Sequence, residues 1–149
     1  MENLDTKNEI IVFSTKNELG SVLNFVHDGL REHDPSKDFK FKLNLVIEEI
    51  FLNIIKHAYK GVEDNYVKVF YMIEEDPLAI KVGFIDKGIL FNPVEYMNNL
   101  EIYMDIISST YEEVGYGIVI IKNNVDDIQY KTENNHNILI FKKYLKKDV

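Results

Sequence analysis

The segment that most restricts how this chain can fold is a helical stretch at residues 43–59. Its apolar residues recur at positions 43, 46, 47, 50, 51, 54 and 58, which is the spacing of a helix that packs along one side. Glu49, Asn53 and His57 follow one another at steps of four and fall on one line beside the apolar side. A solvated face is more often mixed lysine and glutamate, so this line indicates a site. Such a line of polar residues also arises by chance beside a core, so the helix alone does not establish a functional site.

Two later stretches strengthen the interpretation of a site. Residues 86–93 read DKGILFNP and begin where a predicted strand ends, so Asp86 is expected at a sheet edge and Gly88 in a tight turn. Residues 114–121 read VGYGIVII. In this stretch, Gly115 and Gly117 precede a run expected to be helical, an arrangement that holds phosphate at a helix N-terminus. Each stretch is common by itself, but their order after the helix favours one shared site.

The three motifs together resemble the nucleotide-binding motifs of the GHKL (Bergerat-fold) ATPases. They read Glu-x-x-x-Asn-x-x-x-His-Ala-Tyr, Asp-x-Gly-x-x-Phe-Asn-Pro and Gly-x-Gly followed by aliphatic residues. Within this superfamily the sequence is most similar to the small bacterial anti-sigma-factor serine/threonine kinases and their stand-alone ATP-binding relatives. The resemblance covers nearly the whole chain. It implies an ATP-dependent protein kinase with ATP and Mg²⁺ as cofactors.

The resemblance also implies a role for each matched residue. Glu49 is expected to act as the catalytic base, and Asn53 to bind ATP and supply a magnesium ligand. Asp86 is expected to accept a hydrogen bond from the exocyclic amine of adenine. His57 is expected near the phosphates or the lid, and Asn137 on the phosphate side. The remaining expected ATP contacts are Gly88, Phe91, Gly115 and Gly117.

The sequence departs from the family pattern in three places. Leu90 stands where many GHKL proteins have a second glycine, and Val114 precedes Gly115. Residues 97–114, the expected ATP lid, contain no lysine or arginine and include several acidic residues, so they offer no Coulomb attraction to phosphates. Two functional hypotheses therefore remain, a kinase and a regulatory binding module that transfers no phosphate. A third interpretation treats the motifs as core and turns of an unrelated α/β domain.

Composition narrows the class of protein. The 149 residues, 46% of them hydrophobic, are sufficient for one domain spanning residues 1–149. The absence of cysteine excludes disulfides and thiolate zinc sites and favours a cytoplasmic location. No apolar run approaches the ~18 residues of a membrane span, so we expect a soluble protein. A net charge of −8 with Arg31 as the single arginine argues against nucleic acid as a ligand.

The predicted elements make an α/β (α+β) two-layer sandwich, a mixed and mostly antiparallel sheet with helices on one face, as in histidine-kinase-type ATPase domains. A first helix is expected from a capping box of Ser14 or Thr15 with Glu18 to about residue 32. His27 and His33 are expected on its surface, and Gly61 should end the second helix. Residues 92–113 show no strong period; they have room for a short helix but are interpreted mainly as a mobile segment. Strands are expected at residues 9–14, 66–73, 78–85, 127–132 and 137–144.

The resemblance further implies protein partners. The related kinases engage a sigma factor and an anti-sigma-factor antagonist of the STAS type, and they control transcription by partner exchange. They are also homodimers, and the exposed first strand of this chain is a possible edge for pairing. Direct contacts to nucleic acid or to a membrane are not expected.

Overall fold

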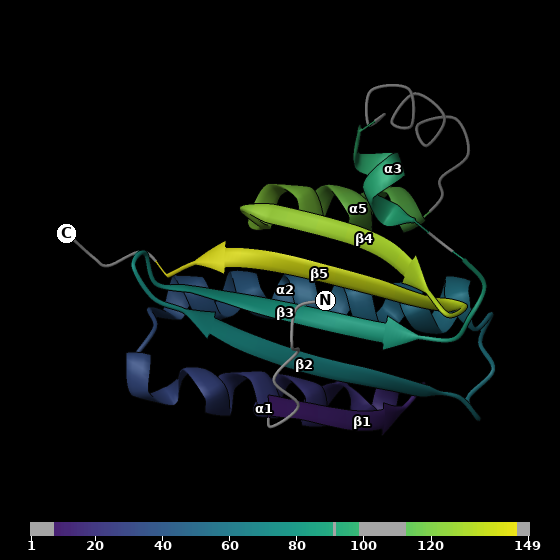
Figure 1. Ribbon diagram of the computed structural model, residues 1–149, viewed down its shortest axis with the longest axis horizontal. Helices are drawn as coiled ribbons and strands as arrows, with labels where there is room; N and C mark the ends of the chain where they lie inside the picture. Colours follow the sequence, from purple (N-terminus) through teal and green to yellow (C-terminus); the bar gives the residue numbers. More distant parts are fainter. Residues whose placement is uncertain (1–7, 91, 99–112, 146–149) are drawn as a thin grey trace.

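The computed structural model describes residues 8–90, 92–98 and 113–145, which form a sheet covered by helices (Figure 1). The strands are β1 (Glu9–Phe13), β2 (Tyr66–Glu74), β3 (Ala79–Asp86), β4 (Asp127–Glu133) and β5 (His136–Tyr144). The α-helices are α1 (Leu19–Leu30), α2 (Lys37–Asn53), α3 (Pro93–Asn98) and α5 (Glu113–Asn124). Two 3₁₀ turns, Lys16–Glu18 and Arg31–His33, flank α1, and a π-helical segment, Ile54–Ala58, continues α2.

The sheet has the strand order β1-β2-β3-β5-β4. All four pairings among the described strands are antiparallel, whereas the sequence led us to expect a mixed and mostly antiparallel sheet. The β4–β5 hairpin turns through Asn134 and Asn135, both with positive φ (52° and 63°). Positive φ at both residues is what a two-residue loop needs in order to match the twist of its strands. Helices α1, α2 and α5 lie on one face of the sheet (Figure 1). The predicted two-layer fold class is confirmed.

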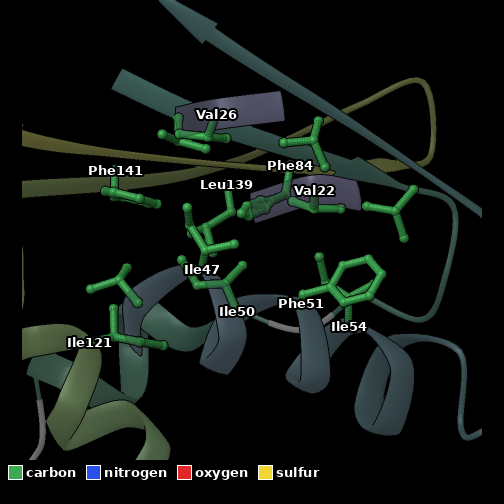
Figure 2. Packing of buried hydrophobic residues seen from close by; sticks show 14 of the residues in the cluster. Val22, Val26, Ile47, Ile50, Phe51, Ile54, Phe84, Ile121, Leu139 and Phe141 are labelled. Carbon is green, nitrogen blue, oxygen red and sulfur yellow. The ribbon is translucent and has the colours of Figure 1, made fainter. Parts of the chain in front are cut away.

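The core lies between the sheet and the predicted face of α2. Every position of the apolar repeat is buried, from Leu43 to Ala58. Figure 2 shows the side chains of α2 pointing toward residues of β3, β5 and α1; the labelled ones include Ile47, Ile50, Phe51, Ile54, Phe84, Leu139, Phe141, Val22 and Val26. Apolar burial on this scale contributes about 25 cal/mol per Å² to stability. The helix that carries the candidate site is therefore held rigidly along its length.

The start of the first helix differs from the prediction. Thr15 is extended (φ −133°, ψ 146°) and makes no side-chain cap; its backbone carbonyl instead accepts from the Glu18 N–H at 3.0 Å, within a 3₁₀ turn. The Ser14 hydroxyl donates to the Val62 carbonyl at 3.0 Å. The predicted capping box is wrong, because the tertiary contact takes the hydroxyl of Ser14 and α1 begins only at Leu19.

The two histidines of the first helical region are not free surface residues. His27 is half-buried, and its Nε2 lies 2.5 Å from Asn44 Oδ1, so it joins α1 to α2. His33 is also half-buried, in the 3₁₀ turn that follows α1. Both histidines thus keep part of their surface exposed, and His27 in addition contacts α2. None of the helices in the described part of the chain has the length and hydrophobicity of a membrane span.

Candidate functional site

The end of α2 changes its helical geometry at the candidate site. Residues Ile54–Ala58 are π-helical, and the Tyr59 N–H donates to the Ile54 carbonyl at 3.0 Å. Gly61, with φ 78°, then ends the segment as predicted. His57 lies within this wider π-helical segment, whereas Glu49 and Asn53 belong to the regular turns of α2. His57 is half-buried and is not among the described residues that line the site cavity.

Glu49 and Asn53 meet α5 at Gly117. A Cβ added at Gly117 would lie 2.3 Å from Glu49 Oε2 and 3.9 Å from Asn53 Nδ2, so the two side chains occupy the space that the glycine leaves. Glu49 is half-buried, and Asn53 is 8% exposed. The Asn53 Nδ2 atom has no hydrogen-bond partner among the described residues. An unsatisfied buried amide costs about 1–3 kcal/mol, which marks this point as a place for a polar ligand.

The sequence led us to expect Gly115 and Gly117 in front of the helix, but both lie within it. Helix α5 begins at Glu113, so Gly115 lies within its first turn, where backbone N–H groups have no partner inside the helix. Gly117 lies beyond that turn. Gly117 is buried. Gly117 lets α5 approach α2 and leaves room for the Glu49 carboxylate. It does not form a loop in front of the helix.

Asp86 ends strand β3 inside the molecule. It is 4% exposed, and its Oδ1 accepts hydrogen bonds from the Gly88 N–H and from Asn137 Nδ2, both at 2.9 Å. Burial raises the pKa of the Asp86 carboxyl above its ordinary value, although the hydrogen bonds from Asn137 and Gly88 and the charge of His136 oppose the rise. A buried carboxylate with one engaged oxygen is suited to recognise a hydrogen-bond donor on a ligand.

Asn137 lies directly opposite Asp86 in the pairing of β3 with β5. Besides Asp86, its Nδ2 donates to the carbonyls of Gly88 (3.3 Å) and Ile89 (3.0 Å), and its Oδ1 accepts from the Tyr130 hydroxyl. The structure thus places Asn137 beside Asp86 and not beside Gly117. The strand register thus sets Asn137 next to Asp86, and its contact on the phosphate side stays a prediction.

Gly88 joins the turn after β3 to the end of the motif helix. A Cβ at Gly88 would lie 2.4 Å from the Ala58 carbonyl oxygen, and the next residue, Ile89, donates its N–H to that carbonyl at 2.8 Å. Only glycine permits this backbone approach, because the atom in the way belongs to the main chain. The contact fixes the position of Asp86 relative to α2.

We expect Gly88→Ala to lower the free energy of unfolding by about 1–3 kcal/mol, because the methyl group forces the turn away from Ala58. Urea unfolding followed by circular dichroism measures the change. The matched control is Gly20→Ala in α1, where an added Cβ meets nothing within 4 Å; this exposed helical position should gain about 0.5–1 kcal/mol. Equal stability of the Gly88→Ala protein and the wild type would contradict the close approach.

A small cavity lies where these elements meet. Its volume is about 30 Å³, and its lining includes the polar residues Asn53, Asp86 and Asn137 from α2, β3 and β5, together with Tyr130 and apolar residues such as Ile50 and Ile121. Pockets that hold drug-sized ligands measure about 300–1,000 Å³. The cavity therefore has the polar groups of a ligand site but not yet the space for one.

Tyr130 was not predicted from the sequence. It lies in β4, where half-buried Ile128 and Tyr130 alternate with exposed neighbours, and this alternation is the signal that indicates an inward side chain. Phe91, an expected ATP contact, lies outside the described residues, as does most of the expected lid. The short helix for which residues 92–113 had room is present as α3, and Asn92 Oδ1 accepts from the Val94 N–H at 2.9 Å at its start.

The fold and these motifs define a histidine kinase-like ATPase domain. The sequence model of that family matches residues 12–143, and the chain belongs to the family. The chain is 27% identical over 108 residues to the serine-protein kinase RsbW of Listeria monocytogenes serovar 1/2a, covering 72% of this chain and 68% of the relative. The RsbW serine-protein kinase of Listeria innocua serovar 6a matches with the same identity and coverage.

A solved structure supports the same fold. The crystal structure of the RsbU and RsbW domains of Rv1364c from Mycobacterium tuberculosis superposes with a TM-score of 0.61 at 13% identity. The match covers 94% of this chain, and the chain spans 33% of the length of that protein. At this identity the likeness shows the fold alone. Together with the family match, it confirms the GHKL fold that the three motifs predicted.

Proposed function

We propose that this chain is an ATP-dependent serine/threonine protein kinase of the anti-sigma-factor type. It would phosphorylate an anti-sigma-factor antagonist of the STAS type and regulate transcription by exchanging that partner for a sigma factor. Membership of the ATPase family and the serine-protein kinase relatives support the class of reaction. The observation that carries the proposal is Glu49, whose carboxylate lies in the space beside Gly117 and Asn53. A protein that only binds nucleotide has no need of a base at this point.

The residues present fit ATP and Mg²⁺ in their chemistry. The buried, unsatisfied Nδ2 of Asn53 is a donor that suits an oxygen of a phosphate, and the amide oxygen of Asn53 is the kind of ligand that Mg²⁺ accepts. In the part of the chain that the structure describes, no group of three or more His, Cys, Asp or Glu residues is placed to hold a metal. A magnesium ion at Asn53 would thus share its coordination with phosphate oxygens and water, and it would neutralise charge on the phosphates.

The side chains of this chain then divide the work. Asp86 would accept a hydrogen bond from the exocyclic amine of adenine and so select adenine over guanine. Glu49 would accept the proton of the attacking serine or threonine hydroxyl. Gly117 holds α5 close enough to α2 that Glu49 and Asn53 share one small volume. His57 and Gly115 stay predicted as supporting contacts on the phosphate side, and Phe91 as a contact at the start of the lid.

Two observations favour the alternative of a non-catalytic nucleotide-binding regulatory module. The cavity beside Asp86 has a volume of only about 30 Å³, and residues 97–114 contain no lysine or arginine to attract phosphate. Both features weaken nucleotide affinity without altering Glu49. The two functions are therefore distinguished by phosphoryl transfer and not by binding alone.

The proposal is tested first by thermal unfolding with Mg-ATP and Mg-ADP. A ligand at about 100 times its dissociation constant adds about 2.7 kcal/mol to stability, which for a domain of this size raises the midpoint by roughly 5–10 °C. Asn53→Ala should reduce the magnesium-dependent part of the rise, and Asp86→Asn should abolish most of it. A wild-type midpoint that does not move at millimolar nucleotide, with both variants folded, would remove ATP from the proposal.

We also propose a cytoplasmic protein with a single domain over residues 1–149 that pairs as a homodimer. Strand β1 is an edge of the sheet, and its outward residues Ile11 and Phe13 are 58% and 48% exposed. Large exposed apolar side chains on an edge strand favour pairing with another chain. Sedimentation velocity of the wild type and of an Ile11→Lys, Phe13→Lys double variant tests the dimer; a monomeric wild type would exclude it.

A further inference from the structure

Tyr130 is the residue of the edge strand β4 that lines this small cavity. The hydroxyl of Tyr130 reaches Asn137 Oδ1, and both residues line the cavity. The phenol ring must therefore extend from β4 across the side of the cavity toward β5. Asn137 in turn donates to Asp86 at 2.9 Å, so a chain of hydrogen bonds runs from Tyr130 to the carboxylate that is expected to recognise adenine. Tyr130 therefore forms part of the cavity wall and is linked to Asp86 through Asn137.

The position of Tyr130 also allows it to leave. Among the strands that the structure describes, β4 lies at an edge of the sheet and pairs with β5 alone, so its side chains can move without disturbing a second ladder. Apart from half-buried Ile128 and Tyr130, the residues of β4 are exposed. Tyr130 is half-buried, so part of its side chain already meets water. Displacing it costs the hydrogen bond to Asn137 and the contacts of the ring with the core.

We propose that Tyr130 determines the nucleotide affinity of this site: it closes the adenine cavity by packing its ring there and bonding its hydroxyl to Asn137, and ATP binds only when it swings out. This inference rests on the proposed function. When a site must open before it binds, its apparent dissociation constant equals the intrinsic one divided by the fraction of molecules that are open. A small open fraction therefore weakens binding. Tyr130 would thus keep the affinity of the wild type low and make it adjustable by anything that moves β4.

Two substitutions separate the hydroxyl from the ring. Tyr130→Phe removes the bond to Asn137 and should lower the dissociation constant of Mg-ADP by about 3- to 10-fold, the equivalent of one hydrogen bond. Tyr130→Ala also removes the ring and should lower it further. The control is Tyr66→Phe, which deletes the hydroxyl of a tyrosine that is 56% exposed in β2 and should leave the affinity unchanged. Isothermal titration calorimetry with Mg-ADP gives the constants.

The kinetics of nucleotide association provide a second measurement. They would be unaffected by Tyr130→Phe if Tyr130 had only a structural role. With a fluorescent N-methylanthraniloyl-ADP, the observed association rate of the wild type should level off at high concentration, because opening precedes binding. In Tyr130→Phe the plateau should rise. If either variant binds Mg-ADP no more tightly than the wild type, while the wild type still depends on Asp86, Tyr130 is not the closing residue and the proposed function stands. If neither variant binds nucleotide although both are folded, the proposed function fails, and this inference with it.

Discussion

Glu49→Gln is expected to lower the rate of phosphoryl transfer by about 10²- to 10⁴-fold, the usual contribution of a positioned general base. The amide keeps the shape of the side chain in the space beside Gly117 but cannot take a proton from the substrate hydroxyl. Affinity for Mg-ATP should stay within about twofold, because Glu49 is assigned to the nucleophile and not to the nucleotide. Transfer of the labelled γ-phosphate to a purified STAS-type antagonist, under single-turnover conditions, measures the rate.

The chain offers two controls for this prediction. Glu48→Gln alters the neighbouring carboxylate, which is exposed, and should leave transfer unchanged. Gly117→Ala keeps Glu49 but places a Cβ at 2.3 Å from its Oε2; the flexible carboxylate can rotate away, so the fold should persist while transfer falls. Full activity of Glu49→Gln would show that Glu49 is not the base. No transfer by the wild type, together with measurable ATP binding, would favour the regulatory module.

Asp86→Asn is expected to weaken Mg-ATP binding at least tenfold, which corresponds to the loss of one charge-assisted hydrogen bond of about 1.5–3 kcal/mol. The substitution is nearly isosteric, and the new amide oxygen can still accept from Gly88 and Asn137, so the variant should fold. Preference for adenine over guanine nucleotides should also fall. Calorimetric titration with Mg-ATP and Mg-GTP measures both effects, and an unchanged ATP affinity would remove Asp86 from the site.

The same variant has a pH signature in the protein without ligand. Because burial raises the pKa of Asp86 in the folded state, the folded protein binds this proton more tightly than the unfolded chain does. The ionised carboxylate therefore costs stability above its ordinary pKa of 3.8, and that cost disappears as the pH falls through the raised value. Relative to Asp86→Asn, the wild type should be more stable at pH 4.5 than at pH 7. Urea unfolding at both values measures this difference; a constant difference would contradict the shift.

The strands and the motif helix followed from local patterns because burial imposes a period on the sequence. The repeat from Leu43 to Ala58 faces the core as predicted, and the hairpin of β2 with β3 lies within a residue or two of its expected bounds. The capping box at Thr15 failed for a reason that is not local, since Ser14 bonds to Val62 across 48 residues. The contact of His27 to Asn44 on the next helix likewise had no local signal.

In the candidate site, too, some features follow from local sequence patterns and others depend on tertiary contacts. The sequence by itself determined the family, the identities of Glu49, Asn53, Asp86 and Gly117, and the helix and strand that carry them, because these depend on residue type and on spacing along one element. Tertiary structure decided what depends on the approach of distant elements. It set the strand register that puts Asn137 beside Asp86 and placed Tyr130 against the cavity. Spacing in a sequence specifies a face of one element, whereas a cavity exists only after several elements have packed.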